Sequence, residues 1–270
     1  MGILLSLAAT SGNIQGSYYI PQSASTIIRS KMNQSTVFIT GISAGLGRAL
    51  AEHYLQQGAE VYGLSRSGSG LVHPRLHEIK LDLGRINKVQ TVLASLMQGV
   101  DRLDLVILNA GILGEIEPMH SLGMNRLKHL MDVNVWSNKL LLDYLCESWI
   151  SVSQVVAISS GAAVNGNKGW GAYSLSKATL NMLVKLYAAE YGNIHFTALA
   201  PGLVDTAMQD HLCDPERVDE NEYPSVQKLR SARGTEAMPT PELAAANIAA
   251  VLPALKAKGL SGDFVDMRNL

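Results

Sequence analysis

The chain has 270 residues, of which 47% are hydrophobic and 17% are charged, and its formal net charge at pH 7 is −1. This length and apolar content favour one large domain with a substantial core, and the near-neutral charge argues against a nucleic-acid partner. The two cysteines, Cys146 and Cys213, are too few for a disulfide framework or a thiolate metal site. We therefore expect no metal, and a cytoplasmic location is the simplest setting for the two thiols.

Residues 1–31 are predicted to form a loose N-terminal extension ahead of the main domain at residues 32–270. The opening run MGILLSLAAT lacks the positive charges that begin a signal peptide. The run is also too short to span a bilayer, so no membrane attachment is expected. The extension either has no function or serves in targeting or docking.

From residue 35 onward, short apolar runs alternate with longer amphipathic segments. The pattern predicts strands at 36–40, 59–64, 77–81, 103–108, 154–159, 194–199 and 262–267, and helices at 47–57, 86–97, 127–149 and 172–191. Another helix should begin at Thr240-Pro241-Glu242. Thr240 would be the N-cap, Pro241 the first helical residue and Glu242 an acid in the first turn. The polar region 207–239 is predicted to be a lid. This alternation predicts a single-domain α/β fold, a doubly wound parallel sheet of the Rossmann type with three α/β/α layers.

The loop between the first strand and the first helix contains Gly41-Ile42-Ser43-Ala44-Gly45. It matches G-x-S-x-G, the nucleophile elbow of serine hydrolases. However, an elbow normally lies deeper in the sheet order, and it has no use for the third glycine, Gly47. A dinucleotide site uses all three glycines, for a tight turn, close approach of the pyrophosphate and close helix packing. The sequence therefore favours a dinucleotide cradle that includes Ser43, over a serine nucleophile or a turn without a ligand.

The end of the second predicted strand indicates which dinucleotide is bound. Sites for NAD usually carry an acid there, which holds the ribose 2′-hydroxyl. This chain has Ser65-Arg66 instead. A guanidinium would attract a 2′-phosphate, so the pair favours NADP(H) over NAD. The alternative is that Arg66 is only a solvated loop residue.

A group of polar residues lies where a carbonyl could be reduced. Tyr173 and Lys177 are four residues apart, so they share one face of their predicted helix. A nearby ammonium lowers the pKa of a tyrosine and makes it a tunable acid. Ser160 follows a strand at the sheet edge where ligands bind. Asn134 lies inside a long predicted helix, although asparagine is a poor helix former.

Together these residues resemble the short-chain dehydrogenase/reductase family. The matching motifs are Thr40-Gly41-x3-Gly45-x-Gly47, Asp82, Asn109-Ala110-Gly111, Asn134, Ser160, Tyr173-x3-Lys177 and Pro201-Gly202-x3-Thr206. The resemblance covers residues 35–270, and Leu108 departs from it where the family often has a second asparagine.

The resemblance implies a role for each matched residue. Tyr173 would be the proton donor, Ser160 would orient the carbonyl, and Asn134 would anchor a water in a proton relay. Lys177 would bind the nicotinamide ribose and lower the pKa of Tyr173. Asp82 would meet the adenine and Thr206 the carboxamide. The whole predicted cofactor site comprises Gly41, Ser43, Gly45, Leu46, Gly47, Ser65, Arg66, Asp82, Leu83, Asn109, Ala110, Gly111, Tyr173, Lys177, Pro201, Gly202, Val204 and Thr206.

The C-terminal part is similar to the sepiapterin reductase and benzil reductase branch of the family. In the sepiapterin reductases a carboxylate in the final strand anchors the pterin ring, and Asp266 matches that position. Benzil-type reductases share much of this ending without using pterins. The lid residue Met208 would contact substrate. The alternative for Asp266 is that it only closes the end of the sheet. The function expected is NADP(H)-dependent reduction of a small ketone, a 1,2-dicarbonyl or a pterin side-chain ketone. The alternatives are a 3-oxoacyl-thioester reductase and a non-catalytic NADP(H) sensor.

The helices that hold Asn134 and Tyr173 are more apolar than one contact with a sheet needs. In the family these helices pair with a second subunit. We therefore expect a homodimer, with a homotetramer as the second possibility.

Overall fold

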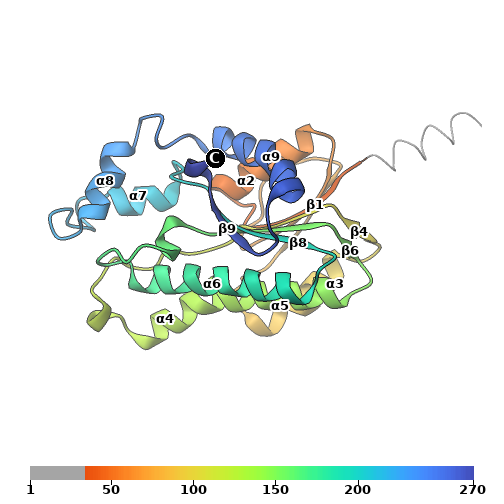
Figure 1. Cartoon of the computed structure of the whole chain (residues 1–270), viewed down its shortest axis with the longest axis horizontal. Helices are drawn as coiled ribbons and strands as arrows, with labels where there is room; N and C mark the ends of the chain where they lie inside the picture. Colours follow the sequence, from red (N-terminus) through yellow and green to blue (C-terminus); the bar gives the residue numbers. More distant parts are fainter. Residues whose placement is uncertain (1–33) are drawn as a thin grey trace, which may run out of the picture. The chain divides into compact units, whose positions relative to one another are not determined.

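The structure is a computed structural model that describes residues 34–270. At its centre lies a parallel sheet of seven strands (Figure 1). The predicted extension at 1–31 lies outside the described residues. The strands run in the order β3-β2-β1-β5-β7-β8-β9. They are β1 (Thr36–Thr40), β2 (Glu60–Ser65), β3 (Leu76–Lys80), β5 (Leu105–Leu108), β7 (Gln154–Ile158), β8 (His195–Ala200) and β9 (Asp263–Asp266).

The strand order reverses between β1 and β5, which makes that position the topological switch point of the sheet. Val37 pairs with Val61 of β2 on one side and with Leu105 of β5 on the other. In open parallel sheets, ligands bind beyond the carboxyl ends of the strands at this point. The topology therefore predicts a ligand site next to Gly41 and Asn109, the residues that follow β1 and β5.

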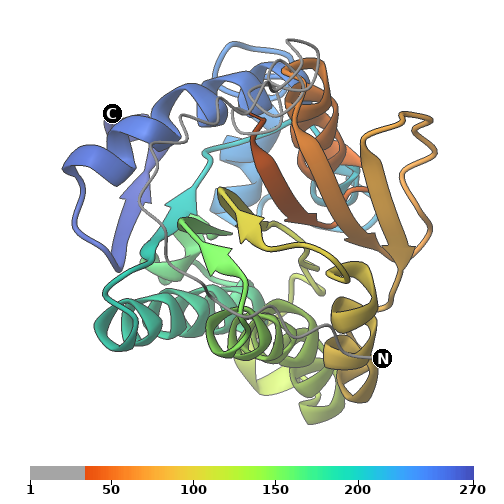
Figure 2. The ribbon, with the colours of Figure 1, turned by 90° about the vertical axis from the view of Figure 1, so that its right-hand side faces the viewer.

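Helices cover both faces of the sheet (Figure 2). On one face lie α2 (Gly45–Gln56) and α9 (Pro241–Lys258), and on the other lie α3 (Val89–Leu96), α5 (Ser137–Glu147) and α6 (Gly171–Glu190). The three-layer, doubly wound fold predicted from the sequence is confirmed. None of the helices described for residues 34–270 combines the length and the hydrophobicity that a membrane span requires.

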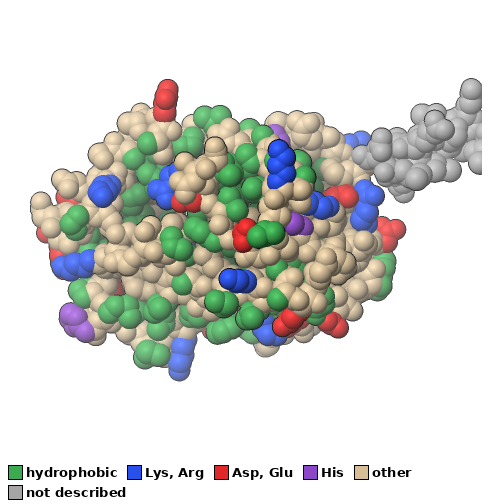
Figure 3. Space-filling model, viewed as in Figure 1, with side chains coloured by type: hydrophobic (Ala, Val, Ile, Leu, Met, Phe, Trp, Pro, Cys, Tyr) green, Lys and Arg blue, Asp and Glu red, His purple; other side chains and the backbone are tan. Residues whose placement is uncertain are grey.

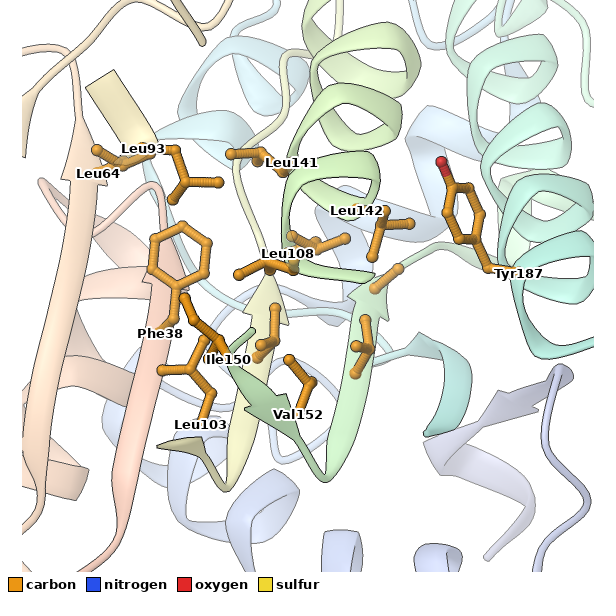
Figure 4. Packing of buried hydrophobic residues seen from close by; sticks show 14 of the residues in the cluster. Phe38, Leu64, Leu93, Leu103, Leu108, Leu141, Leu142, Ile150, Val152 and Tyr187 are labelled. Carbon is orange, nitrogen blue, oxygen red and sulfur yellow. The ribbon is translucent and has the colours of Figure 1, made fainter. Parts of the chain in front are cut away.

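The hydrophobic core lies on both sides of the sheet, so the central strands are apolar on both faces. Every residue of β5 and of β7 is buried, as expected for parallel strands under two helical layers. Figure 4 shows one of the two main clusters, in which Phe38, Leu108 and Leu141 are each at most 1% exposed. This close packing fixes the strand ends that carry the site.

Three predicted elements are divided in the structure. The helix predicted at 86–97 is a 3-10 helix, η1 (Ile86–Lys88), followed by α3. The helix predicted at 127–149 is α4 (Met124–Met131), a π-helical segment η3 (Asp132–Trp136) and α5. The strand predicted at 103–108 is divided into β4 (Arg102–Leu103), which pairs with β6 (Ser151–Val152), and β5. The division falls at Asp104, whose carboxylate accepts a 2.8 Å hydrogen bond from the backbone N–H of Thr36.

The predicted lid contains two helices that the sequence pattern did not indicate, α7 (Ala207–Cys213) and α8 (Pro224–Ala232). Arg233, just after α8, forms ion pairs with Asp205 at 3.0 Å and with Asp210 on α7. These contacts join the end of the lid to its beginning.

Candidate active site

A cavity of about 470 Å³ opens at the carboxyl ends of the central strands, and α7 and α8 contribute to its wall. It contains almost every site residue predicted from the sequence. The predicted residues in its lining are Gly41, Ser43, Gly45, Leu46, Gly47, Ser65, Arg66, Asp82, Leu83, Asn109, Ala110, Gly111, Ser160, Tyr173, Lys177, Pro201, Gly202, Val204, Thr206 and Met208. Asn134 and Asp266 are outside that lining.

The glycine loop has the shape of an anion cradle. Gly41 and Gly45 have φ angles of +79° and +54°, which favour glycine. A Cβ at Gly47 would overlap the Gly41 carbonyl oxygen and the Asn109 amide. The loop leads into α2, whose N-cap residue is Ala44 and whose first turn holds no acidic residue. The N–H groups of that turn therefore have no side-chain cap, and together with the helix dipole they suit a pyrophosphate.

Two side chains tie the ends of β1 and β5 together beneath this loop. The Thr40 hydroxyl accepts hydrogen bonds of 3.0 Å from the backbone N–H groups of Asn109 and Ala110. In return, the Asn109 side-chain amide donates to the Thr40 carbonyl at 3.0 Å. Asn109 thus shapes the floor of the cavity by bracing the backbone.

At the far end of the cavity lie the residues expected to bind adenosine. Ser65 is buried at the end of β2, where its hydroxyl accepts a 3.0 Å hydrogen bond from the Gly68 N–H. Arg66 is exposed, and within residues 34–270 it forms no ion pair. Asp82 accepts from the Gly84 N–H at 3.0 Å and is the one carboxylate among the described residues of the lining.

Ser160, Tyr173 and Lys177 meet at the other end. Ser160 follows β7, and its hydroxyl accepts a 3.1 Å hydrogen bond from the Ala162 N–H. Tyr173 and Lys177 lie one turn apart on α6, and Lys177 Nζ is 5.6 Å from the centre of the Tyr173 ring. Lys177 is 3% exposed and donates to the Ile158 carbonyl at 2.7 Å.

Burial shifts both titrating groups of this site toward their neutral forms. It raises the pKa of Tyr173 to about 12, while a hydrogen bond with Ser160 acts in the opposite direction. Burial also lowers the pKa of Lys177 to about 8. The expected lowering of the Tyr173 pKa by Lys177 is not found, because desolvation of the phenolate dominates. Tyr173 is therefore a protonated phenol at neutral pH.

Asn134 lies behind the cavity, fully buried in the π-helical segment η3. Its side-chain oxygen accepts from the Ile112 N–H, and its amide donates to the Ile112 carbonyl, both at 2.8 Å. The same amide donates to the Ser176 hydroxyl at 3.0 Å. Asn134 therefore connects the loop after β5 to α6, the helix of Tyr173.

Asp266 is the last residue of β9, and its carboxylate binds Arg268, two residues further along the chain. Its carboxylate accepts from the Arg268 Nε at 2.9 Å and from the Arg268 backbone N–H at 3.0 Å. These contacts lower the pKa of the carboxyl below its usual range. Asp266 is not among the residues that line the cavity, although its carboxylate lies close to Gly161, the residue after Ser160.

The lining also includes residues that the sequence reasoning did not place there. Most are apolar and surround the Tyr173 end: Leu113, Trp170, Leu203, Leu212 and Leu229. Trp170 is three residues before Tyr173, and their rings meet edge to face at 6.0 Å. That spacing was a usable signal, because residues three apart share a helix face. Gln209 also lines the cavity.

Comparison with known proteins gives a consistent family assignment. Residues 35–217 match the family model described as short chain dehydrogenase. A benzil reductase ((S)-benzoin forming) of Bacillus subtilis is 29% identical over 225 residues, which are 79% of this chain and 91% of that protein.

Solved structures share the fold. A crystal structure of a short chain dehydrogenase/reductase from Saccharomyces cerevisiae has a TM-score of 0.75 at 24% identity, covering 86% of this chain and 96% of that one. A short chain dehydrogenase of Shigella flexneri complexed with NADP has a TM-score of 0.66 at 24% identity, covering 87% and 98%.

Proposed function

The chain is a member of the short-chain dehydrogenase/reductase family, and we propose that it is an NADP(H)-dependent carbonyl reductase. The observation that carries this proposal is the position of Ser160, Tyr173 and Lys177 in one cavity with an anion cradle. A protein that only sensed NADP(H) would not need this acid beside its cofactor. The intact group therefore favours an enzyme.

Three features support NADP(H) over NAD. Ser65 and Arg66 line the cavity at the end of β2, where an NAD site usually carries an acid. Arg66 has no ion pair within the described chain, so its guanidinium is available for a 2′-phosphate. The Shigella flexneri relative was solved in complex with NADP. The residues present thus fit the dinucleotide, from the cradle to Arg66.

The bound cofactor would supply the hydride for the carbonyl carbon. The Ser160 hydroxyl and the Tyr173 phenol would hold the carbonyl oxygen of the substrate, and Tyr173 would donate its proton to that oxygen. Lys177 would stabilise the phenolate that remains, because an ammonium nearby favours the charged form. Its pKa of about 8 lets Lys177 exchange a proton near neutral pH.

The substrate end of the cavity favours an apolar ketone. Leu113, Trp170, Leu212 and Leu229 surround the Tyr173 ring with hydrocarbon surface, which suits an aryl or alkyl 1,2-dicarbonyl. The benzil reductase relative is named for such a substrate. A pterin side-chain ketone has less support, because Asp266 is bound by Arg268 and lies outside the lining.

The proposal is tested by the initial rate of NADPH loss with the purified protein. Benzil, sepiapterin and an acetoacetyl thioester would be compared, with NADH and Tyr173→Phe as controls. We expect turnover of benzil with NADPH that is lost in Tyr173→Phe. Turnover of the thioester alone would instead assign a 3-oxoacyl-thioester reductase, and no turnover with any of them would contradict the proposal.

We further propose that the protein is a cytoplasmic homodimer that pairs through α6. Figure 3 shows hydrophobic side chains over the region that Figure 1 labels α6 and α5. Leu175, Met182 and Leu186 are each about half exposed (46%, 55% and 51%), and their spacing places them on one stripe of α6. Light scattering should give the mass of a dimer, and Met182→Lys should give a monomer. A monomeric wild-type protein would contradict this assembly.

The proposed cytoplasmic location is in keeping with the two cysteines. Cys146 and Cys213 are both free thiols, as expected in a reducing compartment. Fractionation of cells would test this location.

A further inference from the structure

Asn138 is a buried polar residue on α5, one helical turn after Asn134, and the proposed chemistry does not use it. It is 1% exposed, and its side-chain Nδ2 donates a 2.8 Å hydrogen bond to the Asn134 carbonyl. The atom of the amide that faces a carbonyl oxygen at this distance must be the donor, which fixes the orientation of the side chain. Its oxygen Oδ1 is then buried with no hydrogen-bond partner within residues 34–270.

This side chain carries a cost that a hydrophobic one would avoid. A buried acceptor without a partner costs free energy. Leu141 and Leu142 are buried on the same helix and have no polar side-chain atom. What the amide of Asn138 provides in return is the bond from Nδ2, so the role of the residue lies in its contact with Asn134.

The contact is made where the helix departs from α-helical geometry. In an α-helix the Ser137 N–H would donate to the Val133 carbonyl, but here it donates to the Asp132 carbonyl, one residue further back. The Ser137 hydroxyl donates to the Val133 carbonyl instead, at 2.7 Å. The buried side chains of Ser137 and Asn138 thus bind two successive carbonyls of the π-helical segment η3.

The segment held by these two bonds carries the Asn134 side chain to the edge of the cavity. Asn134 Oδ1 accepts from the Ile112 N–H, and its Nδ2 donates to Ser176 on α6. A Cβ at Gly111, which lines the cavity, would lie 3.3 Å from Asn134 Oδ1 and 3.5 Å from Lys177 Nζ. A shift of the Asn134 backbone would therefore reach the cavity floor and α6 together.

We propose that Asn138 is a positioning residue, whose amide holds the Asn134 carbonyl and thereby fixes the Asn134 side chain against Ile112 and α6. Without Nδ2 the π-helical segment is held less firmly, the bond from the Ile112 N–H opens more often, and Tyr173 is placed less accurately for proton donation. The effect on catalysis rests on the proposed function, whereas the contact with Ile112 can be measured without a substrate.

The test compares two side chains of nearly the same shape in place of Asn138. Threonine on a helix can donate to the carbonyl four residues back, as Thr179 does to the Leu175 carbonyl on α6, whereas valine has no donor. The variants are therefore Asn138→Thr and Asn138→Val. The control is Ser95→Ala, which removes a bond of the same type, from the Ser95 hydroxyl to the Thr91 carbonyl, on an exposed part of α3.

Two properties would be measured for the wild type and each variant. Hydrogen exchange, followed by NMR without cofactor, reports how often the bond of the Ile112 N–H opens, and the Val156 N–H on the central strand β7 reports the opening of the core. Initial rates with NADPH and benzil give kcat.

We expect Asn138→Val to speed the exchange of Ile112 about tenfold relative to that of Val156, and to lower kcat about tenfold, as for the loss of one buried hydrogen bond. Asn138→Thr should keep both quantities near their wild-type values, and Ser95→Ala should leave them unchanged. If Asn138→Val does not fold, Asn138→Ser and Asn138→Ala make the same comparison with and without a hydroxyl.

Four results would overturn the inference. They are unchanged exchange of Ile112 in the variant without a donor, equal changes in the variants with and without a donor, an equal rise of exchange at Ile112 and Val156, and faster exchange at Ile112 with an unchanged kcat. If the wild type did not reduce benzil, the proposed function would fail, and the exchange comparison alone would still decide whether Asn138 holds Asn134 in place.

Discussion

The substitution Gly41→Ala tests whether the floor of the cradle is as tightly packed as the structure shows. A Cβ at Gly41 would lie 2.9 Å from the Asn109 Nδ2 and 3.0 Å from the Ala110 Cα. Both atoms belong to the brace between β1 and β5, so neither can move freely. The residue also has a φ of +79°, in the left-handed region that alanine disfavours.

The expected cost has two separable parts. Left-handed backbone costs an alanine about 1–2 kcal/mol, and the crowded contact adds an overpacking cost of about 1–3 kcal/mol. Gly99→Ala isolates the first part, because Gly99 has a φ of +80° and nothing within 4 Å of its Cβ position. Gly41→Ala should therefore lower the melting temperature further than Gly99→Ala, by about 2–4 °C per kcal/mol of difference for a domain of this size.

The same contact should also weaken cofactor binding. Moving the Ala110 backbone by a few tenths of an ångström shifts the cavity floor. A loss of 1.4 kcal/mol in binding corresponds to about tenfold in Kd. Fluorescence titration would give the NADPH Kd of both variants, which we expect to rise about tenfold or more in Gly41→Ala and not at all in Gly99→Ala. Equal stability and equal Kd in the two variants would refute the packing argument.

Three further predictions concern the reacting residues and the cofactor end. Tyr173→Phe should lower kcat by about 10²–10⁴-fold, the range for loss of a general acid, with little change in the NADPH Kd. Steady-state rates and an NADPH titration measure the two quantities, and an unchanged kcat would contradict the role of Tyr173. The stability of Lys177→Met relative to wild type should be greater below pH 8 than at pH 10 by on the order of 3 kcal/mol, because burial lowers the lysine pKa to about 8 from about 10.4 in the unfolded chain. Above pH 8 the folded wild type binds fewer protons than its unfolded chain, so its stability rises and the stability difference between variant and wild type should shrink toward pH 10. Urea unfolding of both proteins between pH 7 and pH 10 measures this difference. A difference that stays constant with pH would contradict the lowered lysine pKa. Arg66→Ala should raise the KM for NADPH about tenfold and leave that for NADH unchanged, and equal effects on both would contradict a 2′-phosphate contact.

The parts of the site that were predictable from sequence are those in which the backbone conformation requires a particular residue. The glycines of the cradle belong to this group, because Gly41 adopts a positive φ and Gly47 has no room for a side chain. The strands of the central sheet were also predictable, since β5 and β7 are buried on both faces and therefore apolar throughout. Tyr173 and Lys177 needed only the helical repeat to be placed together.

Other features depend on contacts between distant segments, which a local pattern does not contain. Arg268 binds Asp266 from two residues away, but only the three-dimensional arrangement shows that the pair lies outside the cavity. The lid helices α7 and α8 were missed because they pack on the cavity wall through scattered residues such as Leu212 and Leu229. Gln209 is polar in sequence, and only the three-dimensional arrangement shows that it is buried.

Asn134 shows how a residue can have a different structural context from the one that its sequence suggests. The sequence marked it as a poor helix former inside a helix, and in the structure it lies in a π-helical segment, a feature often found at functional sites. Its side chain binds Ile112, which follows the cavity floor, and Ser176, whose hydroxyl donates to the Tyr173 carbonyl at 2.8 Å. Asn134 thus holds the cavity floor and Tyr173 in one hydrogen-bonded unit. A role in positioning Tyr173 follows from these bonds, and the relay through a water remains a separate prediction.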